Sequence, residues 1–76
     1  MNKQVFVVYG SEDGILGVYT TLKRAWNRSV SYIQQCDDMK STFEECKGKI
    51  DEFGVFTVYG TRYGSNAEIN QFEINH

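Results

Sequence analysis

The sequence predicts a single α+β domain over residues 1–76, with the element order ββααββ. Near each end of the chain, a run of β-branched and aromatic residues leads into a glycine-containing turn, which is typical of a strand entering a hairpin. Between the two hairpins, apolar residues recur at intervals of three and four, as they do along one side of a helix. We therefore expect a four-stranded, mainly antiparallel sheet with both helices packed on one face.

The two predicted hairpins share a sequence pattern. Residues 5–14 (VFVVYGSEDG) and residues 55–64 (VFTVYGTRYG) agree at six of ten positions. Gly14, which follows an aspartate, favours the positive φ of a tight turn, and Gly64 begins the turn that precedes a return strand over residues 68–75. Duplication of a hairpin and convergence of short strand-turn sequences both explain this repeat.

The first helix is expected to begin at an N-cap supplied by Thr20 or Thr21. Its apolar stripe consists of Leu22, Ala25, Trp26, Val30 and Ile33. The opposite side carries the basic residues Lys23, Arg24 and Arg28. This is the pattern of an amphipathic helix with one side in the core and a basic side in solvent.

The second predicted helix combines an apolar stripe with acidic pairs. The stripe consists of Met39, Phe43, Cys46, Ile50 and Phe53. Beside it, acidic pairs recur every seven residues, at 37–38, 44–45 and 51–52, and form an acidic ridge. Gly48 lowers helix stability by roughly 1 kcal/mol relative to alanine and leaves open whether the helix is continuous, whereas Gly54 is expected to end it.

The residues on each face predict the positions of the strands in the sheet. We expect the strands at 5–9 and 55–59 to be central because they are apolar on both sides, and the strand at 68–75 to be an edge or half-exposed strand because it alternates. The helices are expected to cover a face made of Phe6, Val8, Phe56, Val58, Phe72 and Ile74. The opposite face would then display Val5, Val7, Tyr9, Tyr19, Val55 and Tyr59. An apolar face of this extent favours a homodimer or a partner protein, unless the second helix crosses over to cover it.

Charge and cysteine content limit the classes of function. Eight basic and ten acidic residues give a formal net charge of −2 and a pI near 5.2, without the basic excess of a strong nucleic-acid binder. The N-terminal residues lack the apolar segment of a secretory signal, and no stretch is apolar enough to span a bilayer. We therefore expect a cytoplasmic protein, in which Cys36 and Cys46 are free thiols rather than a disulfide.

Few residues are suited to catalysis or to holding a cofactor. The only histidine is His76, the last residue, where no buried partner is expected to tune it, so histidine-dependent bases and cysteine nucleophiles are disfavoured. One histidine and two cysteines ten apart do not supply the four ligands of a zinc site. Gly10, Gly14 and Gly17 are not followed by the lysine and hydroxyl of a phosphate-binding loop. We predict a protein that is not an enzyme and has neither a cofactor nor a metal.

Two groups of side chains are candidates for binding a partner protein. The first is the acidic side of the second helix, with Asp37, Glu44, Glu45, Asp51 and Glu52, which would attract a basic partner. The second is aromatic and consists of Tyr9, Tyr59 and Tyr63. The alternative is a small RNA- or single-stranded-nucleic-acid-binding protein, in which sheet aromatics stack on bases and phosphates are held by Lys23, Arg24 and Arg28. The negative net charge makes nucleic acid the second choice.

The first third of the chain resembles a group of phage proteins. Residues 5–10 (VFVVYG), followed by residues 17–21 (GVYTT) and an amphipathic helix, are similar to the opening of small accessory proteins of tailed bacteriophages, which have a strand, an acidic turn, a GVY(S/T) strand and a helix. The resemblance implies a protein of the bacterial host cytoplasm that binds and inhibits a host or defence protein, such as a CRISPR effector, a nuclease or a toxin. A structural, dimerising component of the virion is a further alternative. The resemblance supplies no catalytic residue.

Overall fold

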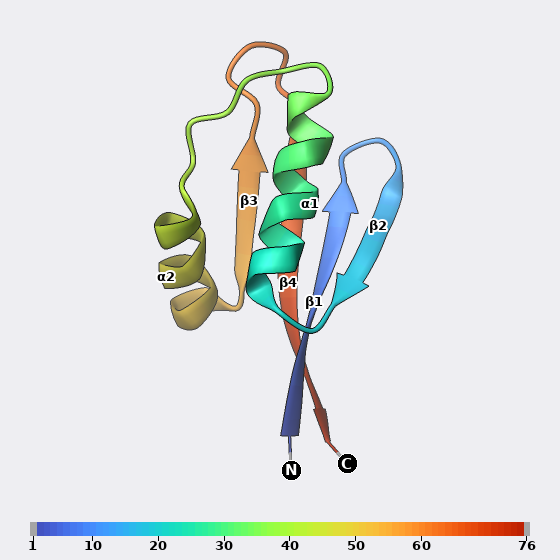
Figure 1. Cartoon of the computed structure of the whole chain (residues 1–76), viewed down its shortest axis with the longest axis vertical. Helices are drawn as coiled ribbons and strands as arrows, with labels where there is room; N and C mark the ends of the chain where they lie inside the picture. Colours follow the sequence, from blue (N-terminus) through green and yellow to red (C-terminus); the bar gives the residue numbers. More distant parts are fainter. Residues whose placement is uncertain (1, 76) are drawn as a thin grey trace.

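A computed structural model describes residues 2–75 and confirms the predicted α+β fold (Figure 1). The elements in chain order are β1 (Asn2–Gly10), β2 (Gly14–Tyr19), α1 (Leu22–Gln34), α2 (Phe43–Phe53), β3 (Val55–Tyr59) and β4 (Asn66–Asn75). The four strands form one antiparallel sheet in the order β2-β1-β4-β3. The sheet therefore consists of two hairpins that join through β1 and β4, and both helices come between these hairpins in the sequence.

The centre of the sheet differs from the prediction, because β4 and not β3 is paired on both sides. β1 and β4 pair from Asn2 opposite Asn75 to Gly10 opposite Ala67. The prediction that the strand at 55–59 is central was therefore wrong. Helix α2 packs against this edge strand and covers one of its faces, so apolar residues on both sides of a strand do not by themselves identify a central position.

The two faces of β4 also differ from the prediction. Residues directly opposite each other in an antiparallel pair project to the same face of the sheet. Ile69 lies opposite the buried Val8, whereas Phe72 lies opposite Val5. Phe72 and Ile74 therefore project away from the helices, and their assignment to the helix-covered face was wrong. Ile69 enters the core in their place.

The register also corrects the assignment of Tyr19. Tyr19 lies opposite Phe6, so its side chain is on the helix-covered face, where it packs against the core. Toward the turn, the pairing shifts by one residue at Leu16, and Ile15 lies opposite Tyr9. The bulge therefore places Ile15 on the face away from the helices.

The start of each helix is set by a capping threonine. Thr21 is the N-cap of α1. Thr42 is the N-cap of α2, and its hydroxyl accepts a hydrogen bond from the backbone N–H of Glu45 at 3.2 Å. The second helix therefore begins at Phe43, and the prediction that its stripe starts at Met39 was wrong.

The second helix is continuous through Gly48 and ends where the sequence predicts. Gly54 follows its last residue with a φ of 75°, a left-handed conformation that ends a helix, and its N–H donates to the carbonyl of Ile50. Met39 lies in the preceding loop and forms an isolated β-bridge with Gly60. This bridge ties the α1–α2 loop to the end of β3.

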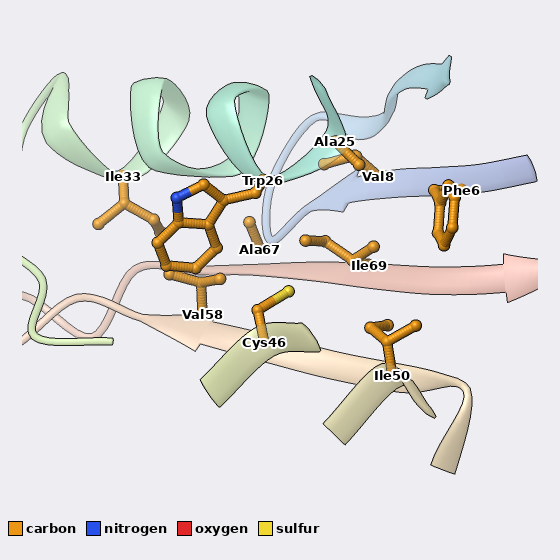
Figure 2. Close-up of a cluster of buried hydrophobic side chains, with 10 residues drawn as sticks. All are labelled: Phe6, Val8, Ala25, Trp26, Ile33, Cys46, Ile50, Val58, Ala67 and Ile69. Carbon is orange, nitrogen blue, oxygen red and sulfur yellow. The ribbon is translucent and has the colours of Figure 1, made fainter. Parts of the chain in front are cut away.

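The core lies between the sheet and the two helices, which pack on the same face (Figure 2). Its buried residues are Phe6, Val8, Ala25, Trp26, Ile33, Cys46, Ile50, Val58, Ala67 and Ile69. Helix α1 packs across all four strands and α2 packs against β3, with the ring centres of Trp26 and Phe43 6.3 Å apart. Each fully buried aliphatic side chain contributes roughly 1.5–3 kcal/mol. The alternative in which α2 crosses to the other face was wrong, and no element within residues 2–75 covers that face.

Beyond the rest of the sheet, β1 and β4 continue as a two-stranded ribbon (Figure 1). β2 pairs with β1 only from Phe6 onward, and β3 pairs with β4 only up to Asn70. Residues 2–5 and 72–75 therefore pair only with each other. The ribbon lengthens the molecule, whose principal extents are 42, 23 and 16 Å.

Candidate functional site

The strongest candidate for a functional site is the face of the sheet that the helices leave uncovered, which we call the open face. Side chains alternate between the two faces along a strand, and directly paired residues share a face, so the register defines its members. They are Lys3, Val5, Val7, Tyr9, Ile15, Val18, Val55, Thr57, Tyr59, Asn66, Glu68, Asn70, Phe72 and Ile74. All four strands contribute, so the surface is continuous across the sheet.

Large apolar and aromatic side chains on the open face are exposed to solvent. The exposed fractions are 62% for Ile15, 60% for Val18, 60% for Tyr59, 48% for Phe72 and 41% for Ile74. The half-buried residues Val5, Val7, Tyr9 and Val55 lie on the same face. Exposed apolar surface of this extent is typical of surfaces through which proteins bind partners.

Among the described residues, the open face carries two charged side chains, and they lie far apart. Lys3 is opposite Ile74 on the ribbon, and Glu68 is opposite Tyr9 toward the hairpin loops. Six positions of the β1–β4 pair separate them, which is roughly 20 Å at about 3.3 Å per residue. The Glu68 carboxylate accepts a hydrogen bond from Asn70 Nδ2 at 2.7 Å. Over the residues that the structure describes, the charges of the open face therefore cancel, with one charge toward each end.

Two of the three predicted tyrosines lie on the open face. Tyr9 on β1 and Tyr59 on β3 lie on either side of β4. Tyr63 instead lies in the β3–β4 loop, 70% exposed, beside a cavity that also borders the end of α1. The structure therefore brings Tyr9 and Tyr59 to one surface and separates Tyr63 from them.

Four of the five predicted acidic residues lie exposed on α2. Residues seven apart on a helix differ by only about 20° in direction, so these four form two rows, Glu44 with Asp51 and Glu45 with Glu52. Four acidic and two basic residues give α2 a net charge of −2. The acidic rows belong to the helix layer, on the other side of the sheet from the open face.

Asp37 differs from the other acidic residues because it is buried, 8% exposed, in the loop after α1. Its Oδ1 accepts backbone hydrogen bonds from Asp38 at 2.7 Å and from Arg62 at 2.9 Å, and its Oδ2 accepts one from Tyr63 at 2.8 Å. Its expected place in the acidic ridge was wrong, because the helix begins only at Phe43. Asp37 instead joins the α1–α2 loop to the β3–β4 loop.

The backbone around Asp37 favours its ionised form. Burial raises the pKa of this carboxyl, but the donated backbone hydrogen bonds together outweigh burial and hold the pKa of Asp37 below its usual value. The donors are the N–H groups of Tyr63, Asp38, Arg62 and Ser65. Gly60 is required beside it, because a Cβ at that position would overlap the Asp37 carboxylate. These two residues form a structural clamp between loops.

The predicted basic residues lie on α1, away from the open face. Arg24 and Arg28 are one turn apart, on the side of the helix away from the buried Trp26. Lys23 Nζ lies 4.5 Å from the ring centre of Phe43 on α2, within range of a cation–π interaction. Because α1 packs on the helix-covered face, the sheet separates these cations from Tyr9 and Tyr59 on the open face.

A polar cavity of about 550 Å³ lies among the hairpin loops and the end of α1. Its lining consists of Ser11, Glu12, Asp13, Tyr32, Gln35, Cys36, Tyr63, Gly64 and Ser65. The Tyr32 hydroxyl accepts a hydrogen bond from the N–H of Glu12 at 3.3 Å, and Cys36 Sγ lies 3.8 Å from Ser65 Oγ. Within residues 2–75, no three His, Cys, Asp or Glu side chains lie close enough together to hold a metal ion. The single histidine, His76, lies outside the described residues.

Both cysteines are free thiols, in different environments. Cys36 is exposed beside the polar cavity, whereas Cys46 is fully buried in the core. Burial raises the pKa of the Cys46 thiol to about 11. Cys46 is therefore a small core residue that stays protonated, and only Cys36 is accessible to reagents.

The sequence predicts part of the open face correctly but misses four of its exposed apolar residues. Val5, Val7, Tyr9, Val55 and Tyr59 lie on the predicted side of the sheet. The missed residues are Ile15, Val18, Phe72 and Ile74. Phe72 and Ile74 were missed because their face depends on the register of β4 with β1, which places Phe72 beside Val5.

No protein-family model matches the chain, and comparisons with characterised proteins and with solved structures give no match. Within residues 2–75, neither helix is both long and apolar enough to cross a membrane. What the chain does is therefore inferred from its own surface.

Proposed function

We propose that this chain is a non-enzymatic protein-binding module and that the open face is its binding surface. The observation that carries the proposal is the exposed apolar surface that crosses all four strands, from Val18 on β2 to Tyr59 on β3. Removing apolar surface from water is favourable by roughly 25 cal/mol per Å². No element within residues 2–75 covers this apolar surface. A second polypeptide bound to the open face would remove it from water.

The distribution of charge favours a protein partner over a nucleic acid. A single strand stacked on Tyr9 and Tyr59 requires cations on the same side of the sheet to hold its phosphates. Among the described residues of the open face, Lys3 is the only cation, and Glu68 adds a negative charge to the same face. The arginines of the nucleic-acid alternative lie on α1, beyond the sheet. A nucleic acid would therefore need to contact aromatic groups on one side of the sheet and basic groups on the other.

The polar groups among the hairpin loops support a role without catalysis. The cavity holds the Cys36 thiol and the Ser65 hydroxyl, but its lining includes neither histidine nor lysine to take a proton from them. Its carboxylates belong to Glu12 and Asp13, which are exposed residues of the β1–β2 turn and lack the buried surroundings in which enzymes hold a general acid or base. Binding a protein partner requires neither a proton acceptor nor a general acid in this cavity.

The narrower form of the proposal is stoichiometric inhibition of a host or defence protein, which the resemblance to phage accessory proteins implies. Such an inhibitor acts by occupying a surface, so it needs no reaction of its own. The acidic rows of α2 offer a second surface, suited to a basic target. Variants that alter one surface at a time can separate the two.

The test is affinity purification of the tagged chain from a nuclease-treated bacterial lysate that also contains an untagged copy of the chain. V18K/Y59K adds charge to the open face, E44K/E45K reverses one end of the acidic rows, and R24E/R28E removes the basic side of α1. We expect the wild type to retain a protein partner at a fixed ratio. We expect V18K/Y59K to lose it and R24E/R28E to keep it.

Two results would contradict this proposal. Retention of the partner by V18K/Y59K together with its loss from E44K/E45K would move the binding surface to α2. Recovery of RNA or DNA from an untreated lysate, lost in R24E/R28E and weakened steeply by salt, would favour the nucleic-acid alternative. Circular dichroism of every variant serves as the folding control.

A further inference from the structure

We propose that the Asp13–Gly14 pair is a site of spontaneous covalent modification, at which Asp13 converts to isoaspartate through a cyclic imide formed with the amide of Gly14. The proposal does not depend on the binding function of the open face. Three observations carry it. Asp13 is exposed in the β1–β2 turn, Gly14 has no side chain to hinder a ring, and the fold restrains the other aspartates.

The reaction needs no reagent other than water. The Gly14 nitrogen attacks the side-chain carboxyl carbon of Asp13 and gives up its proton, a C–N bond forms, and one carboxyl oxygen leaves as water. Water then adds to one of the two carbonyl carbons of the imide. Cleavage of the bond to the side-chain carbon restores aspartate, whereas cleavage of the bond to the main-chain carbon leaves isoaspartate. The water lost is thus regained, and no residue is oxidised or reduced.

The surroundings of Gly14 leave room for this ring. A Cβ at this position would meet nothing within 4 Å, and the residue has a φ of 73°. Any other residue type would place a Cβ next to the attacking nitrogen and hinder ring closure. Gly14 also lies opposite Gly10 at the last pair of the β1–β2 ladder, where a hairpin opens most easily. Among the four aspartates and five asparagines of the chain, only Asp13 precedes a glycine.

The fold opposes the same reaction at the other three aspartates. Asp37 is buried, and its carboxylate cannot lose an oxygen without breaking the hydrogen bonds that the β3–β4 loop donates to it. Asp51 lies inside α2, where the amide that follows it belongs to the helical hydrogen-bond ladder. Asp38 precedes Met39, which has a side chain and whose backbone is bridged to the end of β3. We therefore expect Asp13 to be the reactive aspartate of the folded chain.

Conversion would alter the turn that sets the register of the first hairpin. An isoaspartate adds one atom to the main chain between Gly10 and Gly14, and loop length determines how the two strands of a hairpin pair. Directly after this turn, the bulge places Ile15 on the open face. In the same turn, the N–H of Glu12 donates to the Tyr32 hydroxyl at 3.3 Å. We expect isomerisation to displace Ile15 and to break this hydrogen bond to α1.

The test incubates the folded full chain in neutral buffer made with water enriched in heavy oxygen, followed by peptide mass spectrometry. Hydrolysis of an imide adds one oxygen from water, so heavy oxygen marks each residue that has passed through the ring. We expect uptake at Asp13 and not at the other aspartates, and labelling of the product by an isoaspartate-specific methyltransferase. A parallel sample in urea gives the rate for the unfolded chain. The native rate at Asp13 should lie within about threefold of it, because exposed turns open at little cost.

Asp13→Glu is the matched variant, because it keeps the charge while its longer side chain must close a larger and less favourable ring. It should remove the uptake from this peptide, and Asp51→Glu on α2 should leave uptake at Asp13 unchanged. Isoaspartate that forms at residue 13 in urea but not in the folded chain overturns the proposal, because the folded turn then protects the pair. Uptake spread over all four aspartates of the folded chain also overturns it.

The effect on the hairpin is measured on the isoaspartate form after chromatographic separation. Its NMR chemical shifts should differ from those of the fresh protein at Ile15 and Tyr32, and should be unchanged at Ile50 on the far side of the core. Unchanged shifts at Ile15 and Tyr32 would overturn the predicted displacement of the turn.

Discussion

Asp37 accepts backbone hydrogen bonds from Asp38 in its own loop and from residues of the β3–β4 loop, among them Arg62 and Tyr63, which lie 25 and 26 positions further along the chain. One carboxylate therefore fixes the relative positions of two loops at the same end of the molecule. Gly60 makes this possible by leaving the space that the carboxylate occupies. The pattern of acidic pairs at seven-residue intervals concealed this role, because it made Asp37 look like a surface residue of a helix.

We predict that Asp37→Asn destabilises the domain more than Glu44→Gln does, in urea unfolding at neutral pH. An amide offers one acceptor oxygen instead of two, and its NH₂ group would face a backbone N–H that now donates to Asp37. Glu44 is exposed on α2 and serves as the matched control. Equal unfolding midpoints for the two variants would contradict the clamp.

The pH dependence of stability tests the same clamp. The folded protein holds the pKa of Asp37 below its unfolded value, which is near 3.8. The stabilisation is therefore complete above that value and is lost as the pH falls through the native pKa. We expect the wild type to lose stability on acidification more steeply than Asp37→Asn. Parallel curves of unfolding free energy against pH would show that Asp37 does not act through its charge.

Gly48 is a position where another residue is expected to make the protein more stable. It lies exposed in the middle of α2, and a Cβ there would meet nothing within 4 Å. We predict that Gly48→Ala raises the free energy of unfolding by about 1 kcal/mol, because alanine restricts the unfolded chain and favours the helix. Gly54→Ala is the opposite control, since its φ of 75° strains any residue with a Cβ. A fall in stability for Gly48→Ala would show an unrecognised contact at this position.

The two thiols should differ in reactivity with a thiol reagent. In the folded chain, Cys36 should react quickly and Cys46 only as fast as the protein unfolds. The raised pKa of Cys46 means that its thiol ionises in the unfolded chain first, so this residue costs stability as the pH rises from about 9 toward about 11. Counting the modified thiols before and after adding denaturant is the measurement. Fast modification of both in the native protein would contradict the burial of Cys46.

At the scale of elements, the order of strands and helices could be predicted because the signals for it are local. Helical spacing of apolar residues, capping threonines and glycine turns each act within a few residues. The start of α2 was missed because Met39 continues the apolar spacing, although Thr42 with Glu45 three positions later is a capping signal. Here the hydrogen-bonding requirement of the helix end outweighed hydrophobic periodicity.

The order of strands in the sheet could not be predicted in the same way. Residues 5–14 and 55–64 are similar in sequence, yet β1 is central and β3 is at the edge. The difference arises from β4, which pairs with both and has no local signal for its two neighbours. The prediction of the candidate site was the least accurate part, because the faces on which Phe72 and Ile74 lie depend on the register of β4 with β1.

Capping gives a prediction at the scale of elements. Thr42→Ala should lower the free energy of unfolding by about 1 kcal/mol, because it leaves the N–H of Glu45 without its partner. Thr57→Ala, a change to a strand residue outside either cap, provides the comparison. If helix content and stability are unchanged in Thr42→Ala, the start of α2 is set by packing and not by the cap.

At the scale of the whole molecule, a homodimer, which is one of the two kinds of partner that an exposed apolar face favours, predicts concentration-dependent stability. If the folded dimer unfolds to separate chains, its thermal midpoint rises with protein concentration by mass action. We expect this rise in the wild type and in Arg24→Glu, and a smaller rise or none in Val18→Lys. Scanning calorimetry at several concentrations measures it. A midpoint independent of concentration in the wild type would contradict a folded dimer.

The pairing of β1 with β4 also determines when the chain can fold. Their contacts join Lys3 to Ile74 and Gln4 to Glu73, so the middle of the sheet has no partner strand until the last element has been synthesised. The β1–β2 hairpin is too small to hold a structure alone, and α1 has only half a sheet to pack on before then. Closing so long a loop makes the folding transition slower than the size of the domain suggests. We therefore expect this domain to fold as one cooperative unit only once β4 is present, with no stable piece formed before then.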